Sequence, residues 1–178
     1  MNKGEEILLV IGFGFQWDHS YGCANERLAK QTLEELEKGE KPVFAQWRIF
    51  RKMRFSDCLK CIDLDIKKHI HVYGQSEKHL SSLKTIKAFK EWQKENYPEL
   101  KRIILITAPP LWKRCKRELN KVFPGINISI VNFPDMDEPK DWFGKKSIFW
   151  WTRSEWQWNL REKIISLFPW KIYEIIFS

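Results

Sequence analysis

The chain has few of the features that anchor a protein in a membrane or direct it out of the cell. No apolar run among its 178 residues approaches the roughly 20 residues that a membrane-spanning helix needs. The acidic start, Met1–Glu6, leads directly into an apolar run and does not have the pattern of a signal peptide. We therefore expect a cytoplasmic protein without a membrane partner.

The chain has no more than four cysteines (Cys23, Cys58, Cys61 and Cys115), which we expect to be free thiols in the cytoplasm. Cys58 and Cys61 have the CxxC spacing of two zinc ligands. No second CxxC or paired-histidine block supplies the other two ligands of a tetrahedral site. No strand leads directly into this CxxC, which disfavours a thioredoxin-like motif. The sequence therefore predicts no metal site.

Several catalytic and cofactor motifs are missing. The chain has no Gly-x-Ser-x-Gly elbow, which argues against an esterase. It has no Walker lysine motif, which excludes a P-loop nucleotidase. Gly12-Phe13-Gly14 lacks the third glycine of a dinucleotide-binding fingerprint. These absences leave open whether the protein is an enzyme.

Positive charge and tryptophan are abundant instead. The net charge is +8, and the lysines and arginines are spread over most of the chain. This pattern is typical of a solvated, lysine-rich surface, and it also suits a polyanion or nucleotide partner. Six of the ten tryptophans follow residue 140, which predicts a tryptophan-rich core or interface near the C-terminus.

Apolar runs alternate with amphipathic stretches along the whole chain. Buried strands are expected at residues 7–11, 41–46, 70–74, 102–107 and 126–131, and helices at 22–38, 58–66, 76–97, 111–123 and from Thr152 or Ser154 to about Phe168. Residues 132–146 are a polar, proline-bearing stretch and a candidate lid or binding loop, and residues 170–177 are expected to dock as a strand or a helix. This alternation predicts one α/β domain over residues 1–178, a three-layer Rossmann-like sandwich with a mostly parallel sheet of about five strands.

Small, polar and cationic residues follow the predicted strands at the carboxyl edge, where α/β sheets bind ligands. Glycines after the first strand allow the backbone to approach an anion, and an arginine can supply the counter-charge. If the helix expected at 76–97 instead starts near Ser81-Ser82, the hydroxyl groups of Ser82 and Thr85 and the free backbone amides form an anion site, and Thr107 adds a hydroxyl group at the end of the fourth strand. The expected ligand-binding residues are Gly12, Phe13, Gly14, Arg27, Ser82, Thr85, Thr107 and Arg114.

Each of these residues also has a purely structural interpretation. The glycines suit a tight turn from strand to loop, and the helix hydroxyls are ordinary polar groups. Thr107 can cap the helix that follows it. Arg27 can be a surface charge, and Arg114 belongs to a basic run over residues 113–117 of the kind that is usually solvated.

Four stretches, in order, resemble the YdcF/SanA/ElyC-like domain, a bacterial family of largely unknown biochemical function. They are Gly12-Phe13-Gly14 with Arg27-Leu28 and residues 36–43, then Ser56-Asp57-Cys58-Leu59, then residues 82–88, and then residues 106–115. The resemblance covers most of the chain and implies a Rossmann-like fold. It also implies S-adenosylmethionine as a possible cofactor, since one relative is described as binding it. Membrane-anchored relatives are linked to cell-envelope integrity, and this chain is similar to the soluble branch.

The chain departs from the family at three positions. Gln46-Trp47-Arg48 stands where the family has Ser-Gly-Gly, Gln75 where it has a carboxylate, and Leu111 where it has a histidine. If relatives use those groups for acid–base chemistry, this chain has lost it. We therefore expect it to bind an anionic or nucleotide-like small molecule at the sheet edge rather than to catalyse a reaction there.

Two other functions remain open. Residues 47–55 interleave cations with aromatic side chains, as single-strand nucleic-acid binders do. Together with the basic helix at residues 113–121 they suggest a nucleic-acid-binding module, although 47–55 can also be an amphipathic segment with its aromatics in the core. The tryptophan-rich C-terminus can also be a protein interface.

Overall fold

The computed structural model describes residues 5–13, 22–46, 49–50, 70–74, 81–133, 142–143, 145, 147 and 149–178. The helix expected at 58–66 lies outside these residues. So do most of the stretches 47–55 and 132–146.

In the described part of the chain, five parallel strands form one sheet in the order β3-β2-β1-β4-β5. They are β1 (Glu6–Ile11), β2 (Val43–Gln46), β3 (Ile70–Tyr73), β4 (Arg102–Thr107) and β5 (Asn127–Ile130). The two central strands, β1 and β4, are continuous apolar runs because helices cover both faces of a parallel sheet. The α/β class and the Rossmann-like sandwich predicted from the sequence are confirmed.

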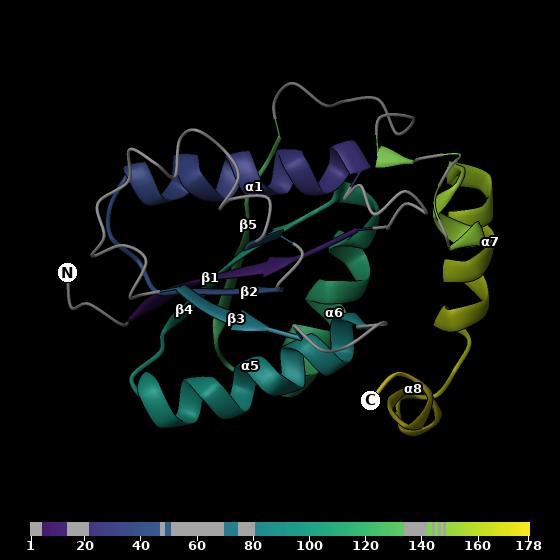
Figure 1. Ribbon diagram of the computed structural model, residues 1–178. Helices are drawn as coiled ribbons and strands as arrows, with labels where there is room; N and C mark the ends of the chain where they lie inside the picture. Colours follow the sequence, from purple (N-terminus) through teal and green to yellow (C-terminus); the bar gives the residue numbers. More distant parts are fainter. Residues whose placement is uncertain are drawn as a thin grey trace.

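Helices lie on both faces of the sheet (Figure 1). Helix α1 (Gly22–Glu37) covers one face, and α5 (Ser82–Asn96) covers the other, with α6 (Trp112–Val122) packed against α5. A short 3₁₀ helix, η1 (Pro109–Leu111), leads from β4 into α6. Helix α5 begins at Ser82, so the expected start at residue 76 is wrong. Ser81 is extended, and its side chain accepts a hydrogen bond from the Lys84 amide, which makes it the N-cap.

The C-terminal part of the chain lies beyond the carboxyl ends of the strands, at the right of Figure 1. It consists of the 3₁₀ helix η3 (Trp150–Thr152), α7 (Glu155–Ser166) and α8 (Trp170–Phe177). Ser154 caps α7, so that of the two predicted caps the serine is correct. The tail at 170–177 is a helix. Among the described residues, no helix has the length and apolar character required to cross a bilayer.

An aromatic cluster forms much of the core between the sheet and α5. Phe44 of β2 is fully buried, and its ring packs against those of Phe89 and Trp92 with centroids 5.3 and 5.4 Å apart. Phe89 in turn contacts Phe123 at the end of α6, with a centroid distance of 5.2 Å. This packing fixes α5 and α6 against the sheet, and with them the side chains that both helices present at its carboxyl edge.

Candidate functional site

The strand order reverses between β1 and β4, which creates the topological switch point where open α/β sheets bind ligands. Ile11 and Thr107 end the two strands side by side. The Thr107 hydroxyl donates to the Ile11 carbonyl at 2.9 Å, and the Thr107 carbonyl accepts from the Trp112 indole at 2.8 Å. Thr107 therefore lies at the predicted edge, where it joins β1 to β4 and β4 to α6.

The chain just after β1 is held by side-chain oxygens from other elements. The Gly12 amide donates to Gln46 Oε1 at 2.9 Å, and the Phe13 amide donates to Asn25 Oδ1 at 2.9 Å. The Gln46 amide group continues this network by donating to Thr85 Oγ1 at 2.7 Å. These contacts join β1, β2, α1 and α5 at one edge of the sheet.

Glycine at position 12 is explained by this close approach. A Cβ atom there would lie 3.0 Å from Gln46 Oε1 and 3.1 Å from Asn25 Oδ1, which is tighter than most carbon–oxygen contacts. A ligand could accept hydrogen bonds from the Gly12 and Phe13 amides only by displacing the two side-chain oxygens. The polar edge predicted from the sequence is present, and its amides are hydrogen-bonded within the protein.

A second polar cluster lies next to this network, between α5, α6, α7 and α8. Arg114 and Glu118, one turn apart on α6, are both buried, and Arg114 pairs with Glu162 of α7 at 3.2 Å. The Glu118 carboxyl group accepts hydrogen bonds from the Ser82 hydroxyl at 3.0 Å and from the Tyr173 hydroxyl of α8. We call these five side chains, together with Arg117 and Arg161, the arginine cluster.

Positive charge exceeds negative charge in the arginine cluster. Arg161 pairs with Glu162 at 3.0 Å, and Arg117 lies over the Tyr173 ring, 4.7 Å from its centroid. Three guanidinium groups thus face two carboxyl groups. Burial raises the pKa of Glu118, while Arg114 and the hydrogen bonds from Tyr173 and Ser82 oppose that rise. Burial, and to a lesser extent the nearby Arg114, lowers the pKa of Arg161 to about 10.

Three polar atoms of the cluster have no hydrogen-bond partner among the described residues. They are Nε of Arg114, Nε of Arg117 and Oε2 of Glu118, all of them shielded from solvent. A buried polar atom without a partner costs about 1–3 kcal/mol, and more when it is charged. The two guanidinium Nε–H groups can therefore donate to a further acceptor, and Glu118 Oε2 can accept from a further donor.

Trp158 of α7 connects the arginine cluster to the end of β1. The Arg114 guanidinium lies over the Trp158 ring, 4.9 Å from its centroid, and the Phe13 ring meets Trp158 edge-on with centroids 5.0 Å apart. The Trp158 indole donates to the Pro110 carbonyl at 3.2 Å, which fixes the ring beside the start of α6. Part of the C-terminal tryptophan group thus covers the carboxyl edge of the sheet.

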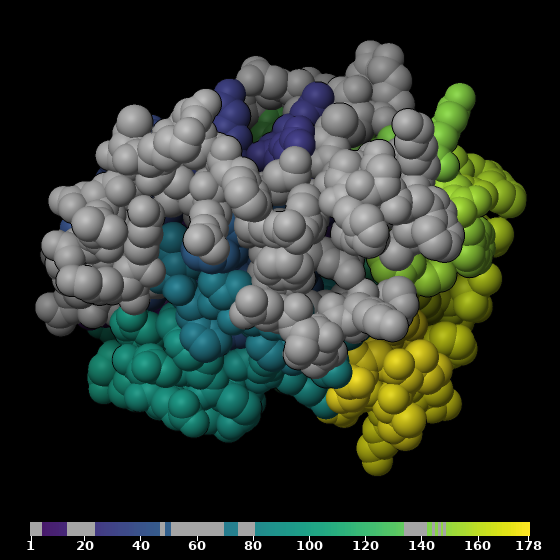
Figure 2. Space-filling view, in the orientation of Figure 1, coloured from purple at the N-terminus to yellow at the C-terminus, as the bar shows by residue number. Residues whose placement is uncertain are grey.

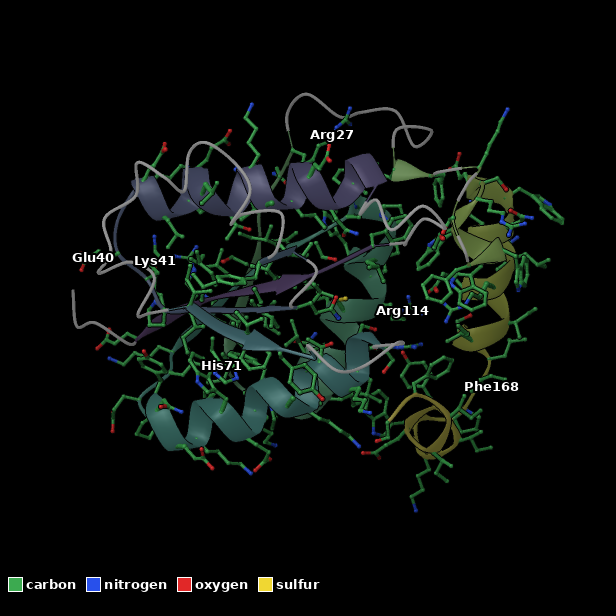
Figure 3. All side chains as sticks on the ribbon, in the orientation of Figure 1. Arg27, Glu40, Lys41, His71, Arg114 and Phe168 are labelled. Atoms are coloured by element: carbon green, nitrogen blue, oxygen red, sulfur yellow. The ribbon has the colours of Figure 1, made fainter. Side chains whose placement is uncertain are left out.

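Of the eight predicted site residues, six take part in the polar contacts described above, Thr107 through its bond to the Ile11 carbonyl. Gly12 and Thr85 share the Gln46 network, and Ser82 and Arg114 share the arginine cluster, to which Phe13 is joined through Trp158. Gly14 lies outside the described residues. Figure 3 shows Arg27 on the face of α1 that points away from the sheet, whereas Arg114 lies between α6 and α7. The structure does not bring these two arginines together, and a ligand-binding role for Arg27 stays a prediction.

Sequence reasoning missed the acceptors Asn25, Gln46 and Glu118 and the donor Tyr173. One signal was available for Glu118: it follows Arg114 by four residues, on the same helix face as the apolar Cys115, Leu119 and Val122. A charged pair on an apolar face predicts buried polar contacts.

The sequence also led to expectations about acid–base groups, cysteine thiols and metal ligands. Leu111 is buried in the core, and Gln75 lies outside the described residues. Burial raises the pKa of the Cys115 thiol well above its usual range, so that it is not an activated nucleophile. Within the part of the chain that the structure describes, no group of three or more histidine, cysteine or acidic side chains is placed to hold a metal ion; Cys58 and Cys61 lie outside that part.

The expected nucleic-acid surface is only partly described. Trp47, Arg48 and residues 51–55 lie outside the described residues. On the basic helix, Arg114 and Arg117 turn inward to the arginine cluster, while Lys113 and Lys116 are exposed.

The chain was compared with known proteins in three ways. No family model, no curated protein and no solved structure matches it.

Proposed function

We propose that the protein binds an anionic, nucleotide-like small molecule at the carboxyl edge of its sheet, next to the arginine cluster. The observation that carries this proposal is the excess of positive charge on Arg114, which is buried, and on Arg117 and Arg161, which are half-buried, over the two carboxyl groups that face them. Buried charge is stable when it is paired, so an anion would balance the cluster.

The donors of the cluster fit the anionic groups of nucleotides. Guanidinium groups bind phosphate and carboxylate through short, charge-assisted hydrogen bonds. Arg114 and Arg117 each have an Nε–H without an acceptor among the described residues. The Ser82 and Thr107 hydroxyl groups lie at the same edge, next to the reversal of strand order, and would have to leave Glu118 and the Ile11 carbonyl to donate to a ligand.

The resemblance of the sequence to YdcF/SanA/ElyC-like domains favours the same edge. It also names S-adenosylmethionine as a ligand to test beside the adenine nucleotides. We do not assign a reaction, because the sequence differs from that family at the positions where its members have ionisable groups.

The proposal is tested by calorimetric titration of the intact chain with ATP, ADP, AMP, S-adenosylmethionine and inorganic phosphate. We expect saturable binding of at least one of them, weakened about 10- to 100-fold by Arg114→Gln, because a hydrogen bond to a charged group contributes about 1.5–3 kcal/mol. Lys113→Gln is the matched control, since it removes the same charge from an exposed neighbour on α6. Arg27→Gln, made in parallel, is expected to weaken binding only if Arg27 contacts the ligand.

The proposal is wrong if none of these compounds binds, or if Arg114→Gln weakens binding no more than Lys113→Gln does. Circular dichroism of each variant shows whether the fold is intact, so that a loss of affinity is not a loss of structure.

A further inference from the structure

A groove separate from the sheet edge lies between α5, the C-terminal end of α6 and α8. It has a volume of about 550 Å³ and also contacts Tyr73 of β3. In Figure 2, α5 (teal) and α8 (yellow) meet at the lower part of the molecule. Because none of its lining side chains belongs to the arginine cluster, the groove is a site in its own right.

Lysine side chains dominate the groove. The lysines that line it are Lys84, Lys87, Lys90, Lys94 and Lys121, and the acidic side chains are Glu91 and Glu174. Among the described residues that line the groove, positive side chains thus outnumber negative ones by three. Four of the lysines are three or four residues apart on α5, which places them along one helix face. From Lys84 to Lys94 this row is about 15 Å long, at 1.5 Å per residue.

The ion pairs within the groove are of the weak, exposed kind. Lys87 pairs with Glu174 at 2.8 Å, and Lys94 pairs with Glu91 at 2.9 Å, with all four side chains at least 38% exposed. Such pairs contribute about 0–1 kcal/mol. An ammonium group also has three donors, so each lysine can hold its glutamate and still contact a phosphate.

Aromatic rings lie beside the lysine row. Trp170, the first residue of α8, and Tyr73 both line the groove and are half-buried. Trp170 is held in place by stacking on Tyr173, with ring centroids 5.5 Å apart. A row of cations next to aromatic rings is the arrangement that binds single-stranded nucleic acid, since phosphates follow the charge and bases stack on the rings.

We infer that this groove binds single-stranded nucleic acid, with the lysines of α5 and Lys121 on the phosphates and with Trp170 stacking on a base. A row of charges is matched better by the repeating phosphates of a strand than by one compact anion. The inference does not depend on the proposed small-molecule function, because the two sites share no residue.

The experiment measures fluorescence anisotropy of a labelled 12-nucleotide oligo(dT) or oligo(U) with the intact chain, from 50 to 300 mM NaCl. The test variant replaces Lys84, Lys90 and Lys121 with Gln. The control variant replaces Lys30, Lys101 and Lys163 with Gln and changes the net charge by the same amount at exposed positions elsewhere.

We expect the test variant to bind at least 10-fold more weakly than the unchanged chain, and the control variant less than 3-fold more weakly. The slope of log affinity against log salt should fall by about 2 in the test variant, at about 0.7 for each phosphate contact with a single strand. Trp170→Ala should weaken binding about 5- to 100-fold with the salt slope unchanged, as base stacking contributes about 1–3 kcal/mol. Trp170→Phe should restore most of that loss.

Three results would overturn the inference. One is that no oligonucleotide binds at 50 mM NaCl. Another is that the test and control variants lose affinity equally, which would mean that only the overall charge matters. The third is that inorganic polyphosphate binds as tightly as the oligonucleotide while Trp170→Ala has no effect, which would identify a general polyanion groove instead.

Discussion

The hydrogen bond between Tyr173 and Glu118 offers the sharpest test of the arginine cluster. Glu118 is fully buried on α6, and it accepts a hydrogen bond from the hydroxyl group of Tyr173 on α8, the last helix. Tyr173→Phe removes that hydroxyl and leaves the ring packing in place. A hydrogen bond to a charged group contributes about 1.5–3 kcal/mol. For a chain of this length, that loss corresponds to a Tm lower by about 3–12 °C.

The size of this effect depends on pH, since Glu118 titrates. Burial raises its pKa in the folded protein above the ordinary value of 4.5. A carboxyl group with a raised folded-state pKa contributes stability that is fully present below the unfolded pKa and is lost as the pH rises through the folded value. The Tyr173 hydroxyl opposes that loss because it stabilises the ionised form. Tyr173→Phe should therefore lower Tm more at pH 7.5 than at pH 4.

Thermal unfolding followed by circular dichroism at both pH values measures this difference. Tyr97→Phe is the matched control, because the Tyr97 hydroxyl donates no hydrogen bond among the described residues, and we expect its Tm to change by less than about 2 °C. Our account of the cluster is wrong if Tyr173→Phe behaves like Tyr97→Phe, or if its effect is the same at the two pH values.

Three further substitutions test the packing that positions the site, each by urea unfolding. Gly12→Ala should lower the free energy of unfolding by about 1 kcal/mol, since the new Cβ lies 3.0 Å from Gln46 Oε1 and displaces one hydrogen bond; an unchanged value would show that the close approach is not required. Ser81→Ala should cost about 1 kcal/mol through loss of the α5 cap, and a smaller loss than that of the exposed Trp156→Ala would contradict the capping role. Phe44→Ala should cost about 3–5 kcal/mol through an unfilled cavity under α5, and a cost below 1 kcal/mol would refute its place in the core.

The sheet was predictable from the sequence because of how parallel sheets are covered. Strands buried on both faces are continuous apolar runs, and residues 7–11 and 102–107 have that character. The start of α5 was harder to predict, since its apolar spacing extends back to Leu80, whereas the Ser81 cap sets where the helix begins. Helix periodicity alone does not contain that local hydrogen bond.

The contacts of the site were only partly predictable. The sequence indicated that Gly12, Ser82, Thr85, Thr107 and Arg114 lie near one sheet edge, because strand ends and helix starts converge there. It did not indicate their partners, since Gln46 and Tyr173 are distant in sequence from the groups they bind. It also did not indicate that α7 and α8 lie at that edge, because the topology of a tail is not determined by its periodicity.

The central position of β1 has a consequence for synthesis of the protein on the ribosome. β1 pairs with β2 on one side and with β4 on the other, so its second edge has no partner until residues 102–107 have been made. That edge belongs to a strand that is almost entirely buried in the finished fold, and an open apolar strand edge favours pairing with other chains. We expect nascent chains that end before β4 to aggregate or to bind chaperones, and chains that extend past β5 to remain soluble. Sedimentation of truncated translation products would measure this difference. A protein with its first strand in the middle of the sheet completes its core late, whatever the stability of the finished molecule.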